Sequence, residues 1–173
     1  MKKIFLTSII AVFLSFGLFA QRYAYVDTQY ILENMPDYVG SQAELDRIAI
    51  EWQKEIEAKF ANIDQLYKKY QADAPLLPED MKQRREDEII NAEKEAKDLQ
   101  KKRFGNDGDL YKKREELMKP IQDRVFNAIE EFSRSKNYAF VFDKSGALTI
   151  IYADPKNDIS NDIMDKLGIT PTN

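Results

Sequence analysis

Three aspartates lie where acid–base chemistry could occur, because each follows a short run of β-forming residues. These residues are Asp27, Asp143 and Asp154. Two carboxylates that face each other across a pocket can act as acid and base. Aspartate at a strand end more often caps a helix or shapes a turn, however. We therefore interpret all three as caps or turn formers rather than as catalytic groups.

Other residue types that catalysis and metal binding commonly use are absent. The sequence contains no histidine and no cysteine. Their absence excludes thiol catalysis, a serine–histidine dyad and metal sites built from Cys and His. Ser145 lies in a predicted turn with no base available, and there is no glycine-rich phosphate loop. The sequence therefore predicts a protein that is not an enzyme, uses no nucleotide and holds no cofactor or metal.

A short segment around Asn106 combines glycines with acidic residues. Asp107-Gly108-Asp109 is similar to the start of a calcium-binding loop, but the spacing and the closing glutamate of such loops are missing. Gly105 and Gly108 each disfavour a helix interior by about 1 kcal/mol. We therefore expect a kink or a hinge within a long helix here, and no bound calcium.

Residues 41–136 have the pattern of a long helical hairpin, and this element dominates the chain. In both halves apolar residues recur every three or four positions, which places them on one stripe of an α-helix. Pro75 and Pro78 interrupt the pattern and predict a reversal with its tip near residues 73–80. The two stripes consist of Leu45, Ile48, Trp52, Ile56, Phe60, Ile63, Leu66 and Tyr70, and of Leu117, Ile121, Val125, Ala128 and Phe132.

A second reversal near Asn106 is the alternative to a continuous return helix. It would give a bundle of three helices at residues 41–72, 79–104 and 110–136. The apolar stripe is thin over residues 82–103, whereas a helix buried between two others should be richer in apolar residues. A thin stripe suits a two-stranded coiled coil with much exposed surface.

Leu76 and Leu77 lie at the predicted tip of the hairpin. In one interpretation they form a hydrophobic contact point for a partner. In the other they fold back and cover the ends of the two helices. Both interpretations fit the sequence equally well.

The residues on either side of the hairpin predict a small body. Strands are expected at residues 23–26, 138–142 and 147–152, the last two as a β-hairpin. The fold class is therefore α+β and predominantly α, with a long antiparallel helical hairpin on a small sheet. The expected organisation is a signal peptide at 1–20, a first strand and short helix at 21–40, the hairpin at 41–136, a β-hairpin and terminal helix at 137–168, and a tail at 169–173.

Three short strands make a marginal sheet with open edges. Association of several copies through their sheets would cover these edges together with the aromatic side chains that the strands carry. We therefore expect an oligomer that is held together at the body. The residues expected at this interface are Tyr23, Tyr25, Val26, Phe140, Phe142 and Ile150.

The N-terminus predicts a secretory signal peptide. Lys2 and Lys3 precede an apolar run at residues 4–19, and cleavage is expected after Ala20. The alternative is an uncleaved membrane anchor, but the run is shorter than the roughly 20 residues that a span needs. Cleavage makes the mature chain more acidic than the net charge of −4 of the whole sequence. We therefore expect no nucleic-acid partner.

Four features follow one another in a characteristic order. They are Ala24-Tyr25-Val26-Asp27 with Tyr30-Ile31-Leu32, the long charged hairpin, Tyr138-Ala139-Phe140-Val141-Phe142-Asp143, and the closing helix at 159–167. Together with the signal peptide, this combination resembles the Skp family, also called OmpH-like, of periplasmic chaperones. The likeness covers residues 23–168.

The resemblance implies a jellyfish-like homotrimer, in which a β body carries three helical tentacles around a cavity. It implies a periplasmic holdase that binds unfolded outer-membrane β-barrel proteins without ATP and prevents their aggregation. Leu76 and Leu77 would then contact the client, and Gly105 and Gly108 would form a hinge. The alternative is a non-catalytic structural or adaptor coiled coil of the cell envelope. Well-known family members are strongly basic, so the acidic charge of this chain argues against contact with lipopolysaccharide or a membrane surface.

Overall fold

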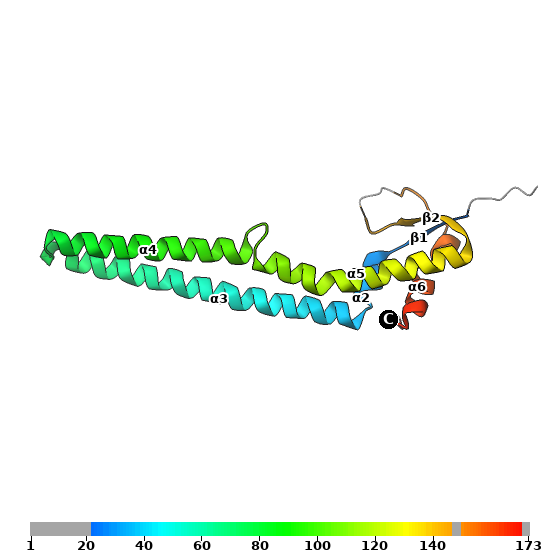
Figure 1. Cartoon of the computed structure of the whole chain (residues 1–173), viewed down its shortest axis with the longest axis horizontal. Coiled ribbons are helices and arrows are strands. Elements are labelled where there is room, and N and C mark those ends of the chain that lie inside the picture. Colours follow the sequence, from blue (N-terminus) through cyan, green and yellow to red (C-terminus); the bar gives the residue numbers. More distant parts are fainter. Residues whose placement is uncertain (1–21, 147–149, 171–173) are drawn as a thin grey trace, which may run out of the picture.

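The fold is a long helical arm with two legs attached to a small body, as the computed structural model of the chain shows (Figure 1). The structure describes residues 22–146 and 150–170. Its elements, in order, are β1 (Arg22–Val26), α2 (Thr28–Glu33), α3 (Pro36–Asp73), the 3-10 turn η1 (Ala74–Leu76), α4 (Glu79–Phe104), α5 (Asp109–Lys136), β2 (Tyr138–Asp143), the 3-10 turn η2 (Pro155–Asn157) and α6 (Ser160–Leu167). The predominantly helical α+β fold predicted from the sequence is confirmed.

Helix α3 forms the outward leg of the arm. It begins at Pro36, earlier than the predicted start at residue 41. Proline fits the first helical position, because its missing N–H is not needed there. Asp37 in the first turn adds a favourable negative charge at the helix N-terminus. The helix ends at Asp73, just before Pro75 and the tight turn at the tip of the arm.

Helices α4 and α5 form the return leg, and residues 105–108 separate them as a narrow loop that stands out from the rod (Figure 1). Tyr67 of α3 donates a hydrogen bond to Glu93 of α4 at 2.8 Å, whereas Arg124 of α5 pairs with Asp37 at the start of α3 at 2.8 Å. The two return helices therefore lie end to end along α3, and the three-helix bundle is excluded.

The length of the loop explains why the return leg keeps its direction. Four helical residues span about one turn plus 40°. A loop of four residues therefore shifts the apolar stripe of the next helix by only about 40° around the arm. The apolar stripes of α4 and α5 can therefore both face α3. Their buried residues are Ile89 and Ala96 in α4 and Met118, Ile121, Val125 and Ala128 in α5.

The body has one hydrophobic core beneath its sheet. Residues alternate along β1, so that Ala24 and Val26 point into the core while Tyr23 and Tyr25 point away from it. Helices α2, α5 and α6 cover the inner face. The buried members of this core are Ala24, Val26, Ile31, Met35, Ile121, Val125, Ala128, Ile159, Ile163 and Met164.

The described sheet has two strands, β1 and β2, which run parallel. Asn137 adopts the left-handed conformation with φ 56° at the end of α5 and turns the chain into β2. The free side of β1 meets the segment before α6, where the Ile159 N–H donates to the Tyr25 carbonyl at 3.0 Å. The side of β1 opposite β2 is thus paired at Tyr25.

The predicted β-hairpin requires a correction. Residues 150–152 belong to no strand, and the remainder of the expected strand, residues 147–149, lies outside the described residues. Strand β2 pairs with β1, in agreement with the expected small sheet at the base of the arm. Ile151 and Tyr152 are 96% and 81% exposed, so these two residues pack against no strand of the described part of the chain. β propensity without such packing is not enough to form a strand.

Candidate functional site

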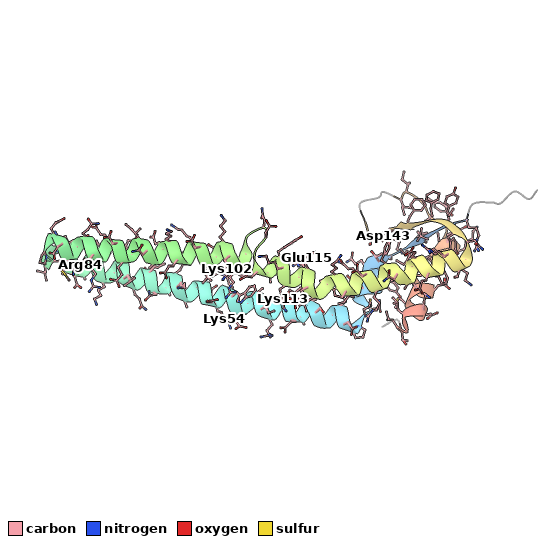
Figure 2. All side chains as sticks on the ribbon, viewed as in Figure 1. Lys54, Arg84, Lys102, Lys113, Glu115 and Asp143 are labelled. Atoms are coloured by element: carbon pink, nitrogen blue, oxygen red, sulfur yellow. The ribbon has the colours of Figure 1, made fainter. Side chains whose placement is uncertain are left out.

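The outer face of the sheet carries a stack of exposed aromatic rings. Tyr23 of β1 lies parallel to Phe140 of β2, with ring centroids 5.9 Å apart and an interplanar angle of 9°. Phe140 in turn stacks with Phe142 at 6.4 Å. All three side chains are exposed, Phe140 by 56%. Figure 2 shows such ring-bearing side chains on the outer side of the sheet, away from the helices of the body.

An open groove of about 490 Å³ continues this aromatic face toward residues 150–157. Among its walls, Tyr152 is largely exposed. A contiguous apolar surface of this kind is typical of a protein–protein contact. The residues that line the groove are Tyr23, Ala24, Tyr25, Phe142, Ile150, Tyr152, Ala153, Asp154 and Asn157.

The six residues expected at an oligomer interface therefore divide into two groups. Tyr23, Tyr25, Phe140 and Phe142 share the outer face of the sheet, and Ile150 lies in the adjoining groove. Val26 lies on the opposite face and is only 2% exposed within the core. We call Tyr23, Tyr25, Phe140 and Phe142, together with the adjoining Ile150, the aromatic face. Val26 packs beneath it in the core.

The carboxylate of Asp143 fixes the end of the sheet (Figure 2). It accepts hydrogen bonds from the Thr28 hydroxyl at 2.6 Å and from the Ser145 N–H at 3.0 Å. Partial burial by itself raises the pKa of Asp143, but these hydrogen bonds outweigh it and lower the pKa below its usual value. The negative charge of Asp143 therefore joins the start of α2 to the end of β2.

Lys144 makes a second polar connection beside Asp143. Its Nζ lies 3.5 Å from Asp27 and 3.2 Å from Asp158, and it also lies over the Tyr25 ring. Burial lowers the pKa of Lys144, but the two carboxylates reverse this effect and raise it overall. Ser160 completes the connection, because its hydroxyl accepts from the Asp27 N–H at 2.9 Å.

The three candidate aspartates of the sequence each serve a local structural role. Asp27 accepts from the Tyr30 N–H at 2.9 Å and caps α2, and Asp154 accepts from the Lys156 N–H at 3.1 Å. Asp143 accepts from Ser145, as described above. Within residues 22–146 and 150–170, no group of three or more acidic side chains could hold a metal ion. The interpretation of these aspartates as caps and turn formers therefore agrees with their contacts.

The two leucines at the tip of the arm differ in their surroundings. Leu76 is 87% exposed. Leu77 is half-buried and packs in a small space lined by residues of α3 and α4 that include Tyr70 and Ile89. Leu77 folds back over the helix ends, as one interpretation of the tip expected. Leu76 projects into solvent, which is the arrangement that a contact point for a partner requires.

The loop at residues 105–108 is closed tightly on itself. The Gly108 N–H donates to the Gly105 carbonyl at 2.8 Å. A Cβ atom added at Gly108 would lie 2.9 Å from the Arg103 carbonyl oxygen, and one added at Gly105 would collide with the Lys101 carbonyl. Both positions therefore need glycine because the backbone passes too close for any side chain.

Next to this loop, the structure reveals a cluster that the sequence did not predict. The guanidinium of Arg103 lies over the ring of Trp52, with Cζ 4.4 Å from the ring centroid, and Phe104 meets the same ring edge-on. Trp52 was predicted only as one member of an apolar stripe. The signal available in the sequence was an arginine at a helix end, directly before a glycine-rich break.

The long surfaces of the arm are charged, with single apolar side chains set among the charges. None of the helices within the described residues is long and apolar enough to cross a membrane. Most ion pairs of the arm join exposed side chains, such as Lys68 with Asp64, and such pairs contribute little stability. The exposed large apolar residues of the three arm helices are Val39, Ile50, Phe60, Tyr67, Ile90, Phe104, Tyr111 and Phe126.

Comparison with known proteins matches the chain to a family profile, a relative and a solved structure. The family profile described as "Outer membrane protein (OmpH-like)" matches residues 22–167. An uncharacterized protein of Aquifex aeolicus (strain VF5) is 29% identical over 167 residues, which cover 96% of each chain. A crystal structure of a candidate outer membrane chaperone (OmpH-like) from Caulobacter crescentus CB15 has the same fold, with a TM-score of 0.69 at 12% identity, and the match covers 87% of this chain and 86% of that one.

Proposed function

Because the chain belongs to the OmpH-like family of outer membrane proteins, we propose that it is a chaperone that holds unfolded outer-membrane β-barrel proteins in the periplasm. In this proposal it acts without ATP, carries out no chemical step and prevents aggregation of its clients. The observation that carries the proposal is an exposed aromatic face on the described two-stranded sheet, at the base of a long arm with a charged surface.

The aromatic face supports a homotrimer. Parallel strands that expose stacked rings on one side leave apolar surface uncovered in a single chain. Contact between copies through Tyr23, Tyr25, Phe140, Phe142 and Ile150 would cover it, while Val26 packs beneath. Three arms attached to such a body would project in one direction and enclose a cavity.

The arm supports weak and adaptable client binding. Its exposed apolar residues are isolated among charges, so each can contact an unfolded chain without forming a deep pocket. Many weak contacts allow a client to stay mobile and to leave again. Leu76 at the tip is the most exposed large apolar side chain of the arm helices and their connecting turn, and we assign it to client contact, with Leu77 supporting the turn from within.

The remaining parts of the proposal concern location and charge. We infer that residues 1–20 direct export and are cleaved after Ala20, which places the mature protein in the periplasm. The chain has 30 acidic against 26 basic residues, so the proposal includes no attraction to lipopolysaccharide, to anionic membrane surfaces or to nucleic acids.

Aggregation assays with several unrelated outer-membrane β-barrel proteins test the proposed function. The mature chain, beginning at Gln21, should suppress aggregation of each client when it is diluted from denaturant, with one client bound per three chains. It should do so equally well with and without ATP. A chain that leaves all these clients to aggregate, and instead captures one folded envelope protein, would support the adaptor alternative.

A further inference from the structure

The arm has a weak point in its apolar contacts. In the described part of the chain, no hydrophobic side chain of α3 between Leu45 and Ile56 is fully buried, and on the return leg none is buried between Ala96 and Met118. This interval contains the loop at residues 105–108, where the return leg is interrupted. At the level of residues 105–108 only α3 is continuous. Burial of apolar side chains therefore stabilises the arm least at this level.

Arg103 lies in this interval, at the end of α4, and contacts the other two helices that meet there. It belongs to the last turn of α4, and its guanidinium stacks on Trp52 of α3. Nη1 donates to Asp109, the first residue of α5, at 2.8 Å. Nη2 donates to Glu55 of α3 at 3.4 Å. One side chain thus joins α4 to α5 across the loop and joins both to α3.

The ion pair of Arg103 with Asp109 is more shielded than the other ion pairs found among the described residues. Its side chains are only 23% and 28% exposed, whereas those of Lys68 and Asp64 are 73% and 60% exposed. Shielding from solvent strengthens the attraction between opposite charges. Stacking of the guanidinium on an indole adds a favourable contact that does not require a second carboxylate.

The same side chain has one unsatisfied group. The Nε of Arg103 is shielded from solvent and has no hydrogen-bond partner within residues 22–146 and 150–170. An unpaired buried donor lowers the net stability of the arrangement that shields it. The cluster is therefore held by strong contacts and opposed by one unfavourable one, which suits a contact that can open.

We propose that Arg103 is a latch that keeps the arm straight across residues 105–108. With the latch closed, α4 and α5 act as one leg beside α3. When Arg103 leaves Trp52 and Asp109, α3 alone carries the arm at this level, and the part that bears the tip can bend relative to the body. Figure 2 shows this region between the labelled residues Lys102 and Lys113.

The latch is tested on the mature chain without any client, so its failure would leave the proposed function untouched. The sequence has no cysteine, which allows spin labels to be placed only at Lys94→Cys in α4 and Gln122→Cys in α5. Labelled chains diluted into unlabelled chains report the distance across the loop by pulsed electron resonance. Arg103→Met should broaden this distance distribution relative to the parent.

Trp52 is the single tryptophan of the chain, so its fluorescence reports the same event independently. In Arg103→Met the emission should shift to the red and quenching by acrylamide should increase. Arg47→Met is the matched control, because Arg47 also pairs with two carboxylates but on the exposed surface of α3. Neither the distance distribution nor the Trp52 emission should change in this control.

An unchanged distance distribution in a folded Arg103→Met chain would overturn the latch, even if Trp52 became more accessible. Should this variant not fold, Asp109→Asn takes its place, because it removes one charge of the shielded pair while keeping the shape of the side chain. Its distance distribution should also broaden, and one as narrow as that of the parent would overturn the proposal.

Discussion

Tyr23 and Phe140 stack in parallel on the outer face of the sheet, with ring centroids 5.9 Å apart. The two residues are register partners in the parallel pairing of β1 with β2. Their contact brings the start of the body and its return segment together on one surface. Both rings remain exposed, and the proposed contact between copies would cover them.

If copies associate through the aromatic face, as proposed, Phe140→Ala should convert the oligomer into monomers. The substitution removes the central ring of the aromatic face but leaves the core beneath β1 unchanged, so helical content should stay the same. Sedimentation velocity at several protein concentrations measures the effect. Tyr111→Ala provides the control, because Tyr111 is also exposed but lies on the arm. Retention of the parental mass by Phe140→Ala would contradict the assignment of this face.

Ile163→Ala should destabilise the body by about 2–5 kcal/mol, the range found for truncating a fully buried isoleucine. Ile163 of α6 is 0% exposed and belongs to the core under the sheet. Urea unfolding followed by circular dichroism gives the free energy of unfolding. Ile150→Ala, at an exposed position of the groove, should change the stability of the monomer much less; equal losses for both variants would refute the described core.

Acid should weaken the body through Asp143 and Asp158. The pKa of each carboxyl is lowered in the folded chain: burial raises it, but hydrogen bonds from Thr28 and Ser145, and from Ser160 and Lys144, outweigh this effect. Their contribution is thus complete above the unfolded pKa of about 4 and is lost as the pH falls through the lower folded value.

Asp143→Asn tests this dependence, because it removes the titrating group. The variant should be less stable than the parent at neutral pH, and the difference should shrink as the pH falls below about 4. Thermal unfolding between neutral and acidic pH measures both quantities. Asp123→Asn is the control, since Asp123 lies on the surface of α5 and its Oδ1 is 3.9 Å from the Lys119 Nζ. A constant difference at all pH values would exclude the proposed linkage.

The two tip leucines should respond differently to truncation. Leu77→Ala should increase hydrogen exchange in the last turn of α3 and the first turn of α4, because Leu77 packs between them. Leu76→Ser should leave exchange unchanged, since its side chain is almost fully solvated. If the tip contacts clients, Leu76→Ser should still reduce suppression of aggregation; full activity would remove Leu76 from the client surface.

Gly105→Ala combined with Gly108→Ala should alter the holding of large clients more than that of small ones. The added methyl groups would collide with the carbonyls of Lys101 and Arg103. The loop at residues 105–108 can therefore no longer keep its present conformation. Aggregation assays with clients of different size measure the effect. Equal holding across all sizes would contradict a role of residues 105–108 in adapting the cavity.

The arm could be predicted from the sequence because its determinants are local. Apolar residues such as Leu45, Ile56 and Ile63 are spaced for one helix face, and these three are the buried residues of α3. The prolines at 75 and 78 force the reversal wherever the rest of the chain lies. Even the loop between Gly105 and Gly108 is visible as a break, since two glycines and two turn-forming residues disfavour a helix.

The body was harder to predict because its contacts join distant segments. The sequence predicts that the first strand and the strands after residue 137 share one small sheet, but it does not predict that β2 pairs with β1 in parallel. No local pattern encodes this choice, which depends on the common core under both strands. The contact of Arg103 with Trp52 is also invisible in the sequence, because its two residues meet only when the legs of the arm align.

The parallel pairing of β1 with β2 also sets an order for maturation. Contacts such as Thr28 with Asp143 span 115 positions, and closing such long loops is slow compared with forming a helix. The first strand must therefore wait for its partner until the chain as far as residue 143 is available. The arm can form in the meantime, so the rod is completed first and the sheet then closes around the two ends that it has brought together.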